Sequence, residues 1–383
     1  MPRIRTLTLA AALLFAGLRA QAVAPAAPMV VGYVFSQETL LQPGQIDAHG
    51  LSRINYAFAN IQDGRMVNGF AADASNLAFL TGLRKENPSL TVLVSVGGWL
   101  WSTNFSDVSL TAQSRALFIQ SAMEFLRRYD LDGLDIDWEY PGLAGSGHPF
   151  RAEDGINFTL LLKELRKQFD RETAKTHRRL YLTIAAGASN DYLAHTEMRQ
   201  SQKYLDTVNL MAYDYVEPGS DPLTGHHAPL FTDPADTRNY SADASVRAFE
   251  QAGVPARKLL LGLPFYGHVW GEVADVNHGL LQAGKPVPNL YAPYSAITSA
   301  MIGHGYVRYW DQTASAPYLY SSEEHRFVSY DDPESIAAKG RYVLKHGLGG
   351  VMFWDYAGDP SGALLGAVNQ SLRPNATGGK TTP

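Results

Sequence analysis

The stretch from Leu131 to Tyr140, which reads Leu-Asp-Gly-Leu-Asp-Ile-Asp-Trp-Glu-Tyr, contains three carboxylic acids at alternate positions. On a β-strand, this spacing places Asp135, Asp137 and Glu139 on one face, with successive Cα atoms roughly 6.5–7 Å apart. Three acids this close cannot all ionise freely inside a protein, so one pKa should rise and a proton should be shared. Because a carboxylic acid that stays protonated near neutral pH can act as a general acid, the stretch predicts acid catalysis.

Two other interpretations of an acidic run are a solvated surface and a metal site. A solvated face would not alternate with Leu, Ile and Trp, and a calcium loop would need a turn with Gly at its sixth position. The adjacent His226 and His227 could suggest a metal pair, but they should point in different directions and have no third ligand nearby in the sequence. We therefore expect no metal, and a role for these histidines at the rim of a cleft.

Eight short apolar segments recur along the chain, and helical stretches separate most of them. They span residues 30–35, 54–59, 91–96, 133–138, 181–186, 208–213, 259–263 and 350–354. Near-continuous runs of Val, Ile, Leu and Ala are typical of buried parallel strands. Eight strands alternating with helices predict an α/β protein with a (β/α)₈ TIM barrel, and a doubly wound sheet is the alternative.

The intervening helices are clearest at residues 112–129 and 156–169, where apolar side chains recur with helical periodicity. A further helix should begin after Asp332, whose side chain can cap it, with Pro333 in its first turn. Gly347 should end this helix, because glycine readily adopts the left-handed conformation found at helix C-termini.

About sixty residues, 267–329, separate the seventh strand from that helix, which is too many for a barrel loop. They include a helical segment, 294–302, and three strand-like segments, 306–310, 316–320 and 327–330. We predict a small α+β insertion beside the barrel mouth, with the barrel formed by residues 23–266 and 330–372. We also expect some aromatic residues of the insertion to line one wall of a deep cleft. The candidates are Trp270, Tyr306, Tyr309, Trp310, Tyr318 and Tyr320.

The two ends of the chain differ in composition from the rest. Residues 1–22 combine two early arginines, a short apolar core and Ala-Gln-Ala, as a secretory signal peptide does. The apolar run is too short to span a bilayer comfortably, so we expect secretion, extracellular or periplasmic, without a permanent membrane anchor. The polar, Gly- and Thr-rich tail, residues 373–383, should be disordered.

Overall charge argues against nucleic acid as a partner. The formal net charge of the 383 residues is −5, and loss of the three arginines in residues 1–22 would make it −8. No tract of Lys and Arg offers a footprint for phosphates. We expect a neutral polymer as substrate, no cofactor, and a monomeric protein.

Four motifs together resemble one enzyme family. Asp132-Gly-Leu-Asp-Ile-Asp-Trp-Glu139 matches the DxxDxDxE signature of the family 18 glycoside hydrolases, the chitinase family. Ser95-Val-Gly-Gly-Trp99, Met211-Ala-Tyr-Asp-Tyr215 and Gly349-Gly-Val-Met-Phe-Trp354 are similar to its third-, sixth- and eighth-strand motifs, in the right order. The resemblance covers nearly all of the mature chain and implies a secreted chitinase that acts on β-1,4-linked N-acetylglucosamine, in chitin and chito-oligosaccharides.

The resemblance also implies a mechanism, because this family departs from the two-carboxylate scheme of most glycosidases. The sugar's own N-acetyl oxygen would attack the anomeric carbon, with retention of configuration. Glu139 would protonate the glycosidic oxygen, while Asp137 would orient the N-acetyl group and stabilise the oxazolinium intermediate. Asp135 would share a proton with Asp137, and the hydroxyl of Tyr213 would hold the N-acetyl oxygen.

The resemblance and the positions at strand ends suggest further contacts with substrate. The residues expected to make them are Trp354, Trp99, Asp214, Met211, Tyr33, Phe58, Tyr266 and Tyr140. One departure is His268, because many relatives carry Arg there and the planar fork of Arg makes contacts that His cannot reproduce. Two alternatives remain. An endo-β-N-acetylglucosaminidase is disfavoured by the long insertion, and a non-catalytic lectin by the complete set of acids.

Overall fold

Eight parallel strands form a closed barrel in the computed structural model, which describes residues 27–234, 236 and 238–373. The barrel strands are β1 (Met29–Phe35), β2 (Arg53–Gln62), β4 (Thr91–Gly97), β5 (Gly133–Asp137), β6 (Tyr181–Gly187), β7 (Thr207–Met211), β8 (Leu259–Pro264) and β15 (Gly350–Trp354). Their order is β1-β15-β8-β7-β6-β5-β4-β2, and pairing of β1 with β2 closes the ring. A short strand, β3 (Arg65–Asn68), is added antiparallel to β2. The predicted (β/α)₈ barrel is therefore confirmed.

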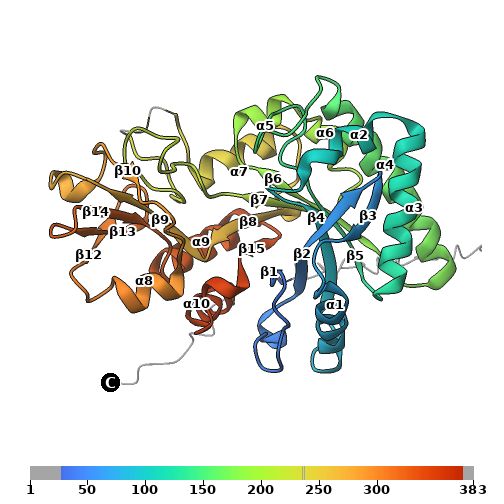
Figure 1. The fold of residues 1–383 in the computed structure, drawn as a ribbon, viewed down its shortest axis with the longest axis horizontal. Coiled ribbons are helices and arrows are strands. Elements are labelled where there is room, and N and C mark those ends of the chain that lie inside the picture. The colour runs from blue at the N-terminus through green and yellow to red at the C-terminus, as the bar shows by residue number, and fades with distance from the viewer. Residues whose placement is uncertain (1–26, 235, 237, 374–383) are drawn as a thin grey trace, which may run out of the picture.

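Helices surround the barrel, which lies on the right in Figure 1. They are α1 (Asp73–Gly82), α2 (Phe105–Leu110), α3 (Ala112–Arg128), α4 (Asp154–Thr176), α5 (Asn190–Ala194), α6 (Met198–Ser201), α7 (Ala242–Gln251), α9 (Pro333–His346) and α10 (Ala363–Ser371). Single 3₁₀ turns occur at Ala48–Gly50, Leu83–Lys85, Ser102–Asn104, Ala256–Lys258, Asn277–Gly279 and Tyr356–Gly358. The apolar side of α3, which includes Phe118, Ala122 and Phe125, is buried, as its periodicity predicts.

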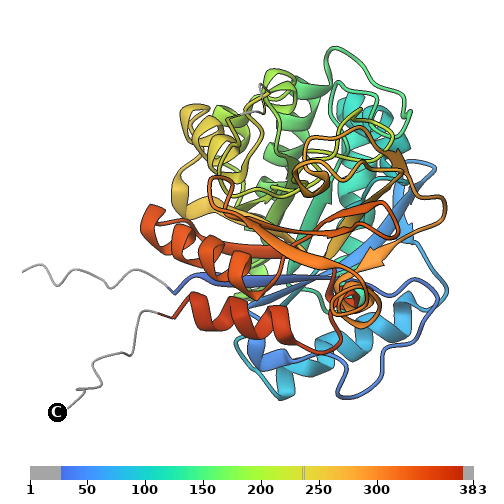
Figure 2. The same cartoon turned by 90° about the vertical axis from the view of Figure 1, so that its left-hand side faces the viewer.

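The helix predicted after Asp332 is α9. The Asp332 side chain accepts hydrogen bonds from the backbone N–H groups of Glu334 and Ser335, and Gly347 ends the helix with a φ of 63°. The sequence interpretation did not include α10, which packs against α9 in both views (Figures 1 and 2). These two helices cover the part of the barrel where the first and last strands meet.

A second sheet is inserted after β8 and lies to the left of the barrel in Figure 1, in orange; Figure 2 views the molecule from this side. It contains β9 (Tyr266–Gly271), β10 (Lys285–Pro286), β11 (Ala292–Pro293), β12 (Val307–Asp311), β13 (Ala316–Ser321) and β14 (Arg326–Ser329), with helix α8 (Tyr294–Ala300). The strands are antiparallel, in the order β10-β9-β14-β13-β12, and β11 pairs with β9. The predicted helix and three strands of the insertion are all present, within a few residues of their expected ends.

The aromatic residues of the insertion mostly form its own core. Trp270 is fully buried and lies against Phe327, while Tyr318 and Tyr320 are also buried. Trp270 therefore does not line an open cleft, whereas Tyr309 and Trp310 are only partly buried and stay candidates for such contacts. A small sheet can bury only one face effectively, so large rings on that face are needed to fill its core.

Two predictions concern the ends of the chain, which lie largely outside the described residues. The predicted signal peptide, residues 1–22, and residues 374–383 of the predicted disordered tail lie outside the described residues. Within the described part of the chain, no helix combines the length and the apolar character that crossing a bilayer requires.

Candidate active site

The three carboxylic acids of the signature lie at the C-terminal end of β5. The strand ends at Asp137, so Glu139 lies two residues beyond it. Exposure increases outward along the series, from 0% for Asp135 to 4% for Asp137 and 8% for Glu139. Because enzymes with this fold carry their active sites at the C-terminal ends of the barrel strands, this is the expected place for chemistry.

Asp135 is held inside the barrel by four hydrogen-bond donors. Its Oδ2 accepts from the hydroxyls of Tyr33 and Ser95, both at 2.8 Å, and its Oδ1 accepts from the Thr183 hydroxyl and from Asn209 Nδ2 at 3.1 Å. Burial raises the pKa of Asp135, and the hydrogen bonds from its neighbours oppose this rise only in part. The donors fix the orientation of this carboxyl group.

Asp137 has a different environment. Its buried Oδ1 has no hydrogen-bond partner among the described residues. Burial, followed by the charges of Glu139 and Asp135, raises the pKa of Asp137 well above its ordinary value. Asp137 therefore favours its protonated form and keeps an oxygen free for a further partner. Its proton sharing with Asp135 stays a prediction.

Glu139 has the pKa that a general acid needs. Burial raises the pKa of its carboxyl group to about 7; a hydrogen bond from Tyr140 opposes the rise and the negative charge of Asp214 adds to it. The backbone N–H of Glu139 donates to Ser102 Oγ at 2.9 Å, and the Ser102 hydroxyl lies 3.2 Å from the Asp137 carbonyl oxygen. Ser102, which no sequence motif indicated, thus braces the backbone that carries the acid.

Trp354, the last residue of β15, lies half-buried among aromatic rings at the mouth. Its ring stacks on Phe58 with centroids 5.5 Å apart, and Tyr33 lies 6.0 Å from it. Gly98 permits this arrangement, because its φ is 81° and a Cβ there would lie only 2.7 Å from the Phe58 ring. The structure places Trp354 where an apolar sugar face could stack, and Phe58 supports it. Tyr33 is buried and braces Asp135.

Trp99 is an exposed aromatic residue at the mouth. It follows β4, its side chain and backbone together are 49% exposed, and its ring lies edge-on to Tyr140 with centroids 6.4 Å apart. An exposed indole at this position is available to stack a second sugar ring.

Tyr213 lies two residues beyond β7. Its hydroxyl is 4.0 Å from the Met352 sulfur, and its ring meets that of Tyr266 edge-on at 6.2 Å. Met211 and Trp354 pack against the same small cluster inside the barrel as Tyr213 does. The structure thus brings residues from the sixth- and eighth-strand motifs to the same part of the mouth.

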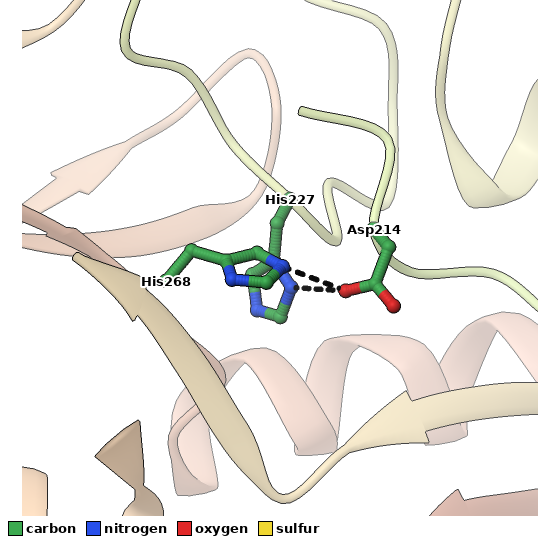
Figure 3. Close-up of side chains that lie close together, drawn as sticks. All are labelled: Asp214, His227 and His268. Carbon is green, nitrogen blue, oxygen red and sulfur yellow. Dashed lines mark hydrogen bonds and ion pairs between the residues drawn. The ribbon is translucent and has the colours of Figure 1, made fainter. Parts of the chain in front are cut away.

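Asp214 is the acceptor for three side chains. The Tyr266 hydroxyl donates to it at 2.7 Å, and its Oδ1 lies 2.8 Å from His268 Nε2 and 3.5 Å from His227 Nδ1 (Figure 3). Burial alone would raise the pKa of Asp214, but hydrogen bonds from His227 and His268 outweigh it and lower this pKa well below its ordinary value. Asp214 therefore stays negatively charged beside Glu139.

Sequence reasoning missed three supporting residues, Ser102, Thr183 and Asn209, and it gave no such role to Ser95 or His227. The one signal for Thr183 in β6 and Asn209 in β7 is a polar residue within an otherwise apolar strand. A polar residue in a buried strand needs a partner, but the sequence does not reveal which one.

The chain matches the family model described as Glycosyl hydrolases family 18 over residues 29–359. Chitinase A1 of Niallia circulans is 39% identical over 354 residues, which cover 85% of this chain and 50% of the relative. Among solved structures, chitinase ChiW from Paenibacillus sp. is 38% identical with a TM-score of 0.85, over 90% of this chain and 33% of that one. A family 18 N-acetylglucosaminidase from Paenibacillus barengoltzii is 40% identical with a TM-score of 0.82, over 90% of this chain and 99% of that one.

The extent of these matches differs. The chain spans half the length of Chitinase A1 and a third of ChiW, but it corresponds to nearly the whole of the N-acetylglucosaminidase. The family match, by contrast, covers all eight barrel strands and the insertion. A barrel with the acids of the DxxDxDxE motif at its mouth, matched by the family model from β1 to beyond β15, identifies this chain as a member of glycosyl hydrolase family 18.

Proposed function

We propose that the protein is a chitinase that hydrolyses β-1,4 links between N-acetylglucosamine units with retention of configuration. Glu139 protonates the glycosidic oxygen. Asp137 holds the N-acetyl group of the substrate, whose carbonyl oxygen attacks the anomeric carbon as the glycosidic bond breaks and the protonated leaving sugar departs. Asp137 offsets the positive charge of the resulting oxazolinium ion, and water then adds to the anomeric carbon and gives its proton to the ionised Glu139. The hydroxyl of Tyr213 positions the N-acetyl oxygen, while Trp354 and Trp99 stack sugar rings.

One observation carries this proposal: the three neighbouring acids have three different environments. Asp135 is saturated with donors, Asp137 has a buried oxygen without a partner among the described residues, and burial raises the pKa of Glu139 to about 7. A free acceptor on Asp137 suits the N–H of an N-acetyl group. If the proton shared by Asp135 and Asp137 moves to Asp135 as positive charge develops, the ionised Asp137 would stabilise the transition state more than the ground state.

The test is the anomeric form of the first product. Chito-oligosaccharides of defined length are hydrolysed while proton NMR follows the new reducing end. Substrate-assisted retention yields the β anomer first, and an α product would rule the mechanism out because it requires a directly attacking water. Fully deacetylated chitosan serves as the matched control, since it lacks the N-acetyl group and should resist cleavage.

The products released in the same time course distinguish the candidate functions. Release of single N-acetylglucosamine units would favour the specificity named for the Paenibacillus barengoltzii relative, whereas dimers and longer fragments favour a chitinase. Cleavage of intact glycoprotein glycans would favour the endo-β-N-acetylglucosaminidase alternative. Binding of oligosaccharides without any turnover would favour a lectin.

We also propose that the enzyme acts outside the cytoplasm as a monomer. The composition of residues 1–22 supports export. N-terminal sequencing of the protein recovered from the producing cells and from their medium tests it, with cleavage expected after Ala22. An uncleaved N-terminus in the cytoplasmic fraction would contradict export, and light scattering gives the oligomeric state.

A further inference from the structure

Asp214, His227 and His268 bring three potential metal ligands together beside the active site (Figure 3). They come from separate segments: Asp214 follows β7, His227 lies in the loop before α7, and His268 belongs to β9 of the insertion. One ligand atom from each lies within 4.8 Å of the other two. Figure 3 shows that both imidazole rings direct a nitrogen at the same carboxylate oxygen.

The protein by itself satisfies His227 poorly. Its side chain is 0% exposed, and its Nδ1 lies 3.5 Å from Asp214 Oδ1, at the limit of a hydrogen bond. Its Nε2, on the other side of the ring, has no hydrogen-bond partner among the described residues. Because buried polar atoms are normally well paired, the long contact of Nδ1 leaves this nitrogen available to a ligand other than the protein. The neighbouring His226 turns away and contacts Asp311 instead.

We propose that Asp214, His227 and His268 form a binding site for a divalent transition-metal ion of the zinc class. Two imidazole nitrogens and one carboxylate oxygen match the donors that Zn²⁺ takes, whereas Ca²⁺ and Mg²⁺ prefer oxygen alone. Glu217 lies next to this group, with its Oε1 3.8 Å from His268 Nε2, but it does not belong to the three residues whose ligand atoms meet. The Tyr266 hydroxyl, which donates to Asp214, would orient the carboxylate ligand.

The observed distances require only a small adjustment. Ligand bonds of about 2.0–2.2 Å in a tetrahedron place neighbouring donor atoms about 3.3–3.5 Å apart. Asp214 Oδ1 already lies 3.5 Å from His227 Nδ1, and its separation of 2.8 Å from His268 Nε2 must widen by about half an ångström. The His268 side chain can shift outward because it is partly exposed.

His268 supplies a ligand that an Arg at the same position could not supply. The resemblance to family 18 places an Arg at this position in many relatives, and a protonated guanidinium has no lone pair for a metal. A bound ion would also occupy Asp214, which is one of the residues expected to contact substrate. We therefore expect the metal to compete with substrate and raise KM, in a manner that a chelator reverses.

Isothermal titration of the metal-free, full-length protein with zinc chloride measures binding directly, without reference to activity. We expect one ion per chain at this site in the wild type and an affinity at least about tenfold weaker in His268→Gln. His268→Arg should bind no better than His268→Gln. His304→Gln is the matched control, because His304 is an exposed histidine of the same insertion and its loss should leave the affinity unchanged.

Cobalt provides an independent signature. Co²⁺ bound by imidazole and carboxylate groups in a low-coordinate site absorbs in the visible range, and this band should vanish in His268→Gln and in His227→Asn. Circular dichroism establishes that each variant is folded, and the partly exposed position of His268 favours folding of the His268→Gln variant. Equal zinc affinity in the wild type and His268→Gln, or no binding by the folded wild type, would overturn the proposal. Both outcomes are independent of whether the protein cleaves chitin.

Discussion

Replacement of Glu139 by Gln should stabilise the folded protein at alkaline pH while it removes most activity. Burial raises the pKa of Glu139 from 4.5 to about 7. The folded state therefore binds this proton more tightly than the unfolded state does. As the pH rises from 4.5 through 7, the free energy of unfolding falls, and the loss is complete above pH 7. A difference of about 2.5 pKa units at about 1.36 kcal/mol each amounts to about 3 kcal/mol.

Guanidinium unfolding at pH 4 and at pH 8 measures this effect. The Gln side chain cannot ionise, so the stability of Glu139→Gln relative to the wild type should rise by about 3 kcal/mol between the two pH values. Any effect of the substitution on packing contributes equally to the unfolding free energy at both pH values, so it cancels in this comparison. Glu86→Gln, at an exposed position, is the control and should show no such rise. If the relative stability of Glu139→Gln were the same at both pH values, the Glu139 carboxyl group would not have a raised pKa and our reasoning would be wrong.

Three further predictions concern the neighbours of the acids. Tyr140→Phe removes a hydrogen bond that lowers the pKa of Glu139. The apparent pKa of the alkaline limb of the kcat/KM profile should therefore rise by about one pH unit. An apparent pKa that is unchanged or lower would contradict this prediction. Tyr33→Phe removes one of four donors to the buried Asp135 and should lower the free energy of unfolding by about 1.5–3 kcal/mol in denaturant titrations; a loss below about 0.5 kcal/mol would count against that role. Trp354→Ala should lower kcat/KM on short chito-oligosaccharides by about tenfold or more, with circular dichroism unchanged, and wild-type kinetics would exclude stacking there.

Local pattern was sufficient to predict the architecture. Each barrel strand is a short run of apolar residues buried on both faces, and each long helix has an apolar side, so periodicity alone locates them. The cap at Asp332 and the end of α9 at Gly347 follow from the chemistry of two residues. The alternation Asp135, Asp137, Glu139 likewise predicts neighbouring acids, because side chains alternate along a strand whatever the rest of the chain does.

Local sequence pattern could not predict which side chains are buried or which distant residues contact one another. The aromatic residues of the insertion suggested a cleft wall, yet Trp270 lies in the core, because exposure depends on which face of the inserted sheet is covered. The four donors to Asp135 come from β1, β4, β6 and β7, and they meet only when the barrel closes.

The difference between what sequence predicts and what tertiary structure decides is clearest for Asp214, His227 and His268. In the sequence, His227 has no third ligand near it, and no local pattern links it to an aspartate after β7 or to a histidine in the insertion. The sequence by itself determined the strands, the helices and the types of residue at their ends. Only the tertiary structure decided which of these side chains meet and how deeply they are buried, because both depend on the packing of segments far apart in the chain.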